Sequence, residues 1–224
     1  MKKIFSFLLV CSVFVSCFPI KIPSRIKNNV VCNEGHYTGL DTLINTKGIY
    51  YYVSSVSSQE KDTFYSCFMF WNDGTVVSIG RQPNEIQPFF DNILSKNKKK
   101  HKEFYLNCWG NYRIIDSTII CQFIYVPYFI SLEDSWYGGE SSYKIIDKNK
   151  LEYLPMMSKS LDPRVNKNEY YNNVRQRYIE ENNGITAVFM SIERIPLPNC
   201  WLKKKKWFWC NEEDWKEYNR KIKK

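Results

Sequence analysis

The feature that most constrains the fold is a succession of short aromatic and β-branched runs, each ended by turn residues. The runs at 63–71 and 75–79 flank an Asn-Asp-Gly sequence. Asp-Gly between two apolar runs is a strong hairpin signal, because a tight turn needs residues that tolerate positive φ. Runs of similar composition predict further strands at 48–54, 104–115, 118–126, 142–146, 151–154 and 187–195. The chain is therefore predicted to be mainly β, with antiparallel hairpins.

The first hairpin predicts which side chains share a face. If Asp73 and Gly74 are the central turn residues, Phe70 faces Val77 and Phe68 faces Ile79. The strand near 104–115 adds alternating apolar residues to the same face. This face is predicted to line a barrel interior that is either a packed core or a cavity for an apolar ligand. The candidate ligand-binding residues are Phe68, Phe70, Val77, Ile79, Tyr112 and Ile114.

Two segments have helical patterns. Apolar residues recur at helical spacing over 84–94, with Asn84 as the predicted N-cap, and this helix is expected to cover one end of the sheet. The basic run 96–102 that follows is interpreted as a solvated loop. At the other end of the chain, Asn211 is predicted to cap a helix with acidic residues in its first turn and lysines in its last. The segment 170–181 fits a helix or a strand equally well.

The N-terminus is typical of an export signal. Lys2 and Lys3 precede an apolar run at 4–15, which is shorter than the roughly 20 residues that span a bilayer. Phe14-Val15-Ser16-Cys17 resembles the lipobox of bacterial lipoproteins. That resemblance implies cleavage before Cys17, a diacylglycerol on its thiol and a palmitate-type acyl chain on its amino group. Phe18 in place of Asp implies sorting to the outer membrane. The alternative is an ordinary secretory signal with an incidental cysteine.

Cleavage at that point leaves six cysteines besides Cys17, namely Cys32, Cys67, Cys108, Cys121, Cys200 and Cys210. In an oxidising compartment an even number favours disulfides, and Cys200–Cys210 is the predicted pair because it closes a short loop. The cysteines at 67, 108 and 121 lie in apolar strand patterns, where buried free thiols are the alternative. No CxxC spacing occurs and the chain has only two His, so no metal site and no cofactor is predicted.

The formal net charge of +9 is concentrated in the runs 96–103 and 201–224, and the rest of the chain is close to neutral. A continuous basic face is therefore not expected, and nucleic acid is not a predicted partner. The segment 203–209 (KKKKWFW) joins lysines to tryptophans, a combination that suits a membrane interface or an anionic partner. The alternative is an edge segment whose aromatic rings pack on the barrel. The candidate contact residues are Lys203, Lys204, Lys205, Lys206, Trp207 and Trp209.

A wider resemblance covers roughly residues 46–215. The segments at 48–51 (GIYY), 68–78 (FMFWNDGTVVS), 108–123 (CWGNYRIIDSTIICQF), 143–154 and 203–215 together resemble small bacterial lipoproteins with a lipocalin-like domain. The resemblance implies an up-and-down barrel with one or two peripheral helices and a mouth open to apolar ligands. It supplies no catalytic residues. The predicted organisation is a signal peptide at 1–16, a lipidated tether at 17–45, the β domain at 46–210 and a C-terminal helix at 211–224.

These features predict an exported lipoprotein that binds a hydrophobic small molecule or another component of the cell envelope. One alternative is a structural or protein-interaction module with a filled core. Another is a carbohydrate-active enzyme that uses loop carboxylates such as Glu133 and Glu140. The histidines, His36 and His101, lie outside any recognisable nucleophile motif, so an enzyme is not the favoured interpretation.

Overall fold

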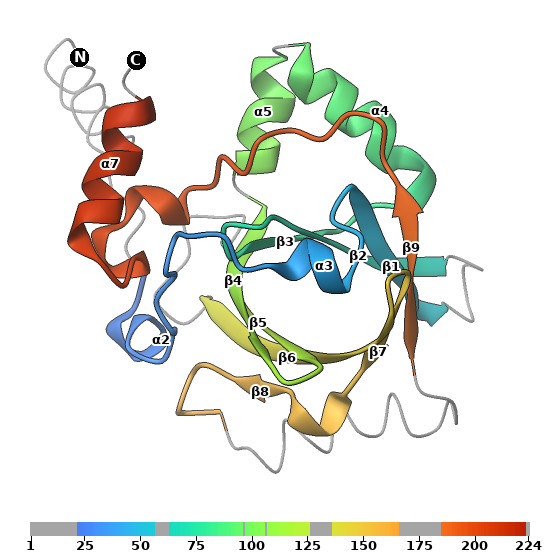
Figure 1. Cartoon of the computed structure of the whole chain (residues 1–224), viewed down its shortest axis with the longest axis horizontal. Helices are drawn as coiled ribbons and strands as arrows, with labels where there is room; N and C mark the ends of the chain where they lie inside the picture. Colours follow the sequence, from blue (N-terminus) through green and yellow to red (C-terminus); the bar gives the residue numbers. More distant parts are fainter. Residues whose placement is uncertain are drawn as a thin grey trace, which may run out of the picture.

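Eight antiparallel strands form a closed, up-and-down barrel of the lipocalin-like kind (Figure 1). The computed structural model describes residues 22–56, 63–95, 97–105, 107–125, 136–165 and 185–222. The barrel strands are β1 (Gly48–Val56), β2 (Thr63–Phe70), β3 (Thr75–Ile79), β4 (Cys108–Ile115), β5 (Thr118–Tyr125), β6 (Tyr137–Asp147), β7 (Lys150–Tyr153) and β9 (Thr186–Ser191). Each strand pairs with the next, and β9 joins β7 to β1, which closes the ring. The short β8 (Lys159–Ser160) pairs with β6. The predicted fold class is confirmed.

The described helices lie outside or at one end of the barrel. They are α2 (Ser24–Lys27), α3 (Leu40–Leu43), α4 (Pro83–Leu94), α5 (Lys98–Tyr105) and α7 (Glu212–Ile222), with 3-10 turns η3 (Pro155–Met157), η4 (Leu202–Lys204) and η5 (Lys206–Phe208). The predicted C-terminal helix is confirmed, and the Asn211 side chain accepts a hydrogen bond from the amide of Glu213 at 2.9 Å.

Two predictions near α4 need correction. The N-cap is Gln82, whose amide donates to Glu85 at 3.2 Å, and the basic run is part of a helix. Burial of Phe104 against the barrel stabilises α5 in spite of its adjacent lysines.

The β2–β3 hairpin has a register one residue away from the predicted one. Within this loop only Gly74 has a positive φ, of 82°. The amide of Trp71 donates to the carbonyl of Thr75 at 3.0 Å, so the loop contains three residues. Phe68 therefore pairs with Ser78, and Phe70 pairs with Val76. Because successive side chains alternate between faces, a shift of one residue exchanges the faces of β3. Val77 and Ile79 consequently point away from the barrel interior, and the prediction that they share a face with Phe68 and Phe70 is wrong.

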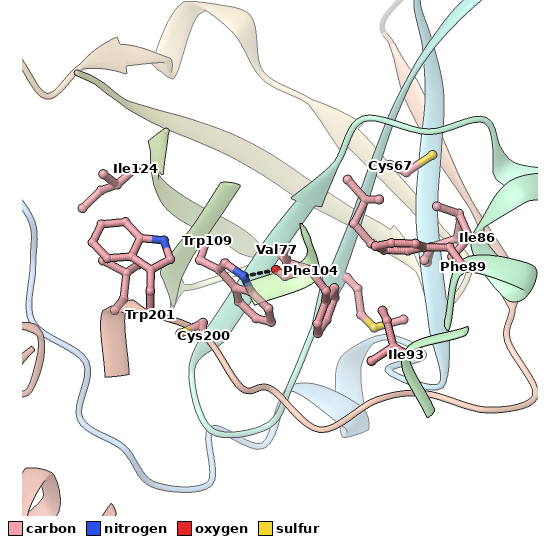
Figure 2. Close-up of a cluster of buried hydrophobic side chains, with 14 of the residues drawn as sticks. Cys67, Val77, Ile86, Phe89, Ile93, Phe104, Trp109, Ile124, Cys200 and Trp201 are labelled. Atoms are coloured by element: carbon pink, nitrogen blue, oxygen red, sulfur yellow. Dashed lines mark hydrogen bonds between the residues drawn. The ribbon is translucent and has the colours of Figure 1, made fainter. Parts of the chain in front are cut away.

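The apolar residues divide into two cores. The interior core lies inside the barrel and contains Leu40, Ile44, Tyr50, Phe68, Phe70, Val76, Tyr112, Ile119, Cys121, Phe123, Tyr143, Leu151, Tyr153 and Ala187. The outer core lies between the barrel wall and the elements that cover it, namely α4, α5 and the C-terminal segment. Figure 2 shows part of it, with Trp109 hydrogen-bonded to Phe104 and with Cys200 and Trp201 of the C-terminal segment nearby. Apolarity on both faces of the strands thus has a single explanation, a barrel wall buried on both sides.

One end of the barrel is closed by α3, which lies over the opening in Figure 1. Leu40 and Ile44, which flank this helix turn, are completely buried in the interior core. Below them the hydroxyl of Tyr50 donates to the carbonyl of Lys148 at 2.7 Å and accepts from the amide of Asn45 at 3.0 Å. These bonds tie α3 to the β6–β7 turn.

The chain before β1 packs on the barrel, which differs from the tether predicted over 17–45. Ile26 has no exposed surface, and Ile22 is buried in the same outer core. Arg25 Nε lies 2.9 Å from a carboxylate oxygen of Asp162. Hydrogen bonds from Arg164 and Arg25 hold the pKa of Asp162 well below its ordinary value. The burial of Ile22 and Ile26 could not be predicted from the sequence, because they belong to no longer periodic pattern and their partners are distant in sequence.

A disulfide joins Cys32 to Cys210, with the two Cα atoms 4.9 Å apart. Beside it, Asn33 forms a parallel bridge with Trp209, and its amide donates to the carbonyl of Phe208 at 2.7 Å. The predicted Cys200–Cys210 pairing is therefore incorrect. Cys200 lies in the outer core as a free thiol, and burial raises its pKa to about 11. Cys67, Cys108 and Cys121 are also free, in agreement with the alternative considered for them.

Candidate functional site

A cluster of tyrosines lines the end of the barrel away from α3. Strand β5 begins beside the β6–β7 turn that α3 contacts and ends at Tyr125, which pairs with Tyr137 at the start of β6. We define the tyrosine cluster as Tyr52, Tyr125, Tyr137, Tyr143 and Tyr153. Its ring centroids are 5.3 Å apart for Tyr125 and Tyr137, 6.0 Å for Tyr52 and Tyr153, and 5.5 Å for Tyr143 and Tyr153. Tyr125 and Tyr137 thus form one pair, and Tyr52, Tyr153 and Tyr143 form a second, connected set of rings.

The cluster combines apolar area with hydroxyl groups. Tyr125 is 41% exposed and Tyr137 is 36% exposed, whereas Tyr143 and Tyr153 are buried. Burial raises the pKa of Tyr143 well above its ordinary value, and the nearby Cys108 thiol together with burial does the same for Tyr125. These hydroxyls are therefore neutral at physiological pH, where they can both donate and accept hydrogen bonds. Such a surface suits a mainly apolar ligand that carries a few polar atoms.

The residues predicted to bind a ligand are only partly brought together. Phe68, Phe70 and Tyr112 are buried in the interior core, and Ile114 packs against it, while Val77 and Ile79 belong to the outer core. The ring centroid of Phe68 lies 4.7 Å from that of Tyr143, so the predicted set borders the tyrosine cluster. Sequence reasoning missed the cluster itself. The signal was the two-residue alternation of Ile119, Cys121, Phe123 and Tyr125, which places the last residue on the interior face.

A cleft of about 330 Å³ lies outside the barrel. One wall is the segment 31–38 and the other is formed by Gly74, the residues 111–114 and Ile120. His36, which was assigned to the tether, lines this cleft, and its Nε2 lies 3.1 Å from a carboxylate oxygen of Glu34.

Glu140 belongs to a polar cluster on the outer wall of the barrel. It lies in β6 rather than in the predicted loop. The side-chain amide of Gln122 donates to Glu140 at 2.7 Å, and Lys159 Nζ lies 3.0 Å from its other oxygen. The carboxylate is thus buried and paired. Glu133, which the enzyme hypothesis also requires, lies outside the described residues.

The lysines of 203–209 do not form one exposed face. Lys203 is only 3% exposed, and its Nζ pairs with the Asp73 carboxylate of the β2–β3 loop. It therefore attaches the C-terminal segment to the barrel, and its assignment to a membrane contact is corrected. Trp207 and Trp209 pack against the outer core. The remaining lysines stay candidates for a membrane contact: Lys204 and Lys206 are exposed and Lys205 is half-buried.

Among the described residues, no group of three or more His, Cys, Asp and Glu side chains is close enough together to hold a metal ion. None of the described helices has the length and apolarity needed to cross a membrane. The signal segment, Cys17 and the segment 170–181 lie outside the described residues.

Comparisons of the chain with family models, with curated proteins and with solved structures gave no significant match. The class of this protein is therefore defined by its fold, a lipocalin-like barrel with one end closed by α3 and the other lined by tyrosines.

Proposed function

We propose that this protein is an exported, lipid-anchored barrel that binds a small, mainly apolar molecule at the tyrosine cluster. The observation that carries the proposal is the difference between the two ends of the interior. The end under α3 is filled by fully buried side chains, whereas the other end keeps Tyr125 and Tyr137 substantially exposed. Partly exposed aromatic rings beside a buried apolar core are typical of ligand sites.

Export is supported by the disulfide. Cys32 and Cys210 are 178 residues apart, and disulfides of this kind persist in oxidising compartments such as the periplasm. The charged and apolar N-terminal run, with the lipobox-like sequence that ends at Cys17, supplies the matching export signal. Together these features support an outer-membrane lipoprotein.

The packing of the N-terminal segment sets how far the barrel can lie from its anchor. Ile22, the first described residue, is buried against the barrel, and Cys17 precedes it by five residues. A chain of this length spans at most about 18 Å. Acyl chains on Cys17 would therefore hold the barrel close to the membrane surface, where apolar molecules are concentrated.

The ligand site is tested with a soluble form, residues 18–224 exported with an unrelated signal peptide, so that no detergent competes for the probe. We expect the uncharged fluorophore N-phenyl-1-naphthylamine to bind saturably, with its emission enhanced by the apolar site. The double variant Tyr125→Ala/Tyr137→Ala is expected to weaken binding at least about tenfold, because two exposed rings supply contact area at about 25 cal/mol per Å².

Tyr37→Ala is the matched control, since Tyr37 is an exposed tyrosine outside the barrel. It is expected to leave the affinity for the fluorophore unchanged. Saturable binding that survives the double substitution would place the site elsewhere. A protein that binds neither the fluorophore nor lipids extracted from an envelope would support the alternative of a filled interior core.

A further inference from the structure

We propose that the cleft outside the barrel, between the segment 31–38 and strands β4 and β5, binds a small organic carboxylate through Arg113. This inference is independent of the proposed ligand site, because the cleft lies on the outer face of the barrel wall. It rests on a fixed wall, on a guanidinium with unused donors and on the local balance of charge.

The wall formed by 31–38 is held at several points. The amide of Val31 donates to the side-chain oxygen of Gln122 at 2.7 Å, and its carbonyl accepts a hydrogen bond from the Asn111 side chain. Cys32 is fixed by its disulfide, and the amide of Thr38 donates to the carbonyl of Asn72 at 2.8 Å. A site whose walls are already ordered loses little conformational entropy when a ligand binds.

The guanidinium of Arg113 has N–H donors that remain available to a ligand. Its side chain lines the cleft and is 35% exposed. Within the described ranges its one acidic partner is Glu140, at 3.5 Å, which is longer than a normal charge-assisted hydrogen bond. Glu140 is already served by Gln122 and Lys159. A guanidinium carries five N–H donors in a planar fork that matches the two oxygens of a carboxylate.

Asn33 adds an unsatisfied donor to the same wall. Its side-chain oxygen accepts from the amide of Gly35 at 2.8 Å, which fixes the orientation of the side-chain amide. The Nδ2 atom is buried and has no hydrogen-bond partner among the described residues. A buried donor without a partner costs about 1–3 kcal/mol. Because Nδ2 is buried, a small shift of the Asn33 side chain toward the cleft would be needed for a ligand oxygen to relieve this cost.

The charge around the cleft favours one negative charge over two. Glu34 is exposed at the rim beside His36, and Glu140 lies behind Arg113. A dianion such as phosphate would be repelled by these two carboxylates, and only Arg113 would be available to neutralise it. A ligand with one carboxylate would neutralise the single positive charge of Arg113. Ile120 and the ring of Tyr37 supply apolar area for the rest of the ligand.

The test uses the full-length lipidated protein in a non-ionic detergent and three probes: phenylacetate, benzoate and N-acetyltyrosine. Binding is measured by saturation-transfer NMR, with 2-phenylacetamide as the uncharged comparator and inorganic phosphate as a competitor. We expect at least one carboxylate to bind saturably, 2-phenylacetamide to bind at least about tenfold more weakly, and phosphate to compete poorly. Arg113→Gln is expected to weaken carboxylate binding at least about tenfold.

Lys144→Gln is the matched control, because it removes one exposed positive charge from the barrel wall outside the cleft. It is expected to leave carboxylate binding unchanged. Thermal unfolding of both variants checks that they fold. Carboxylate binding that persists in Arg113→Gln, or the absence of saturable binding by all three probes, would overturn the proposal. Loss of binding in Tyr125→Ala/Tyr137→Ala would instead assign the probes to the interior.

Discussion

Replacing Cys32 and Cys210 by serine is expected to lower the free energy of unfolding by about 5 kcal/mol. The disulfide joins residues 178 apart, so its loss frees almost the whole chain in the unfolded state. The chain entropy that a disulfide removes grows with the length of the loop it closes, which makes this the largest single effect that we expect. Urea denaturation of the oxidised protein and of Cys32→Ser/Cys210→Ser measures it, and the variant is expected to show the steeper slope because its unfolded chain exposes more surface.

Single variants separate the observed pairing from the one expected from the sequence. Cys32→Ser is expected to abolish the disulfide, as judged by the mass gained on reduction. Cys200→Ser is expected to leave the disulfide in place, because Cys200 is a free buried thiol. The opposite pattern, a disulfide retained in Cys32→Ser and lost in Cys200→Ser, would restore the Cys200–Cys210 pairing and contradict the structure.

Trp109→Ala is expected to destabilise the fold by about 3–5 kcal/mol. Trp109 is completely buried in the outer core, where its ring centroid lies 5.0 Å from that of Phe104 and 5.3 Å from that of Trp71. Its indole Nε1 donates to the carbonyl of Phe104 at 2.9 Å, the bond drawn in Figure 2. The substitution therefore leaves a cavity between the barrel wall and α5 and removes one of the two donors to the Phe104 carbonyl, the other being the amide of Asn107.

Trp215→Ala is the control for Trp109, because Trp215 lies half-exposed on α7 and donates a longer bond, 3.3 Å, to the carbonyl of Lys204. It is expected to change the free energy of unfolding by less than about 1 kcal/mol. Chemical denaturation measures both variants. An equal decrease in the free energy of unfolding would contradict the claim that burial of Trp109 in the outer core stabilises the barrel.

The strands and the C-terminal helix could be predicted because their signals are local. The turns at 116–117 and 148–149 each separate two β-rich runs, and Asn211 precedes three acidic residues at a helix start. The register of the β2–β3 hairpin could not be settled in this way. Asn-Asp-Gly is compatible with a loop of two or three residues, and the choice is stabilised by distant contacts such as the amide of Tyr112 donating to the carbonyl of Gly74.

The packing of the N-terminal segment also could not be predicted from local sequence signals. Ile22 and Ile26 are buried in the outer core, where Ile26 lies against Gly138 of β6, and Cys32 bonds to Cys210. Nothing in the composition of 18–40 indicates these partners. Part of the tyrosine cluster could be predicted from the alternation of residues along β5. The outer cleft could not, because it depends on where 31–38 crosses β4 and β5, which only the tertiary structure shows.

The intact mass of the protein, isolated from membranes of a Gram-negative host, tests the lipid anchor and the disulfide most directly. We predict a chain that begins at Cys17, carries a diacylglyceryl group and an N-acyl chain, and gains one pair of hydrogens on reduction. Cys11→Ser should behave identically, whereas Cys17→Ser should accumulate as an unlipidated precursor. A wild-type chain without lipid, whether it keeps Met1 or is cut elsewhere, would contradict the lipid-anchored barrel.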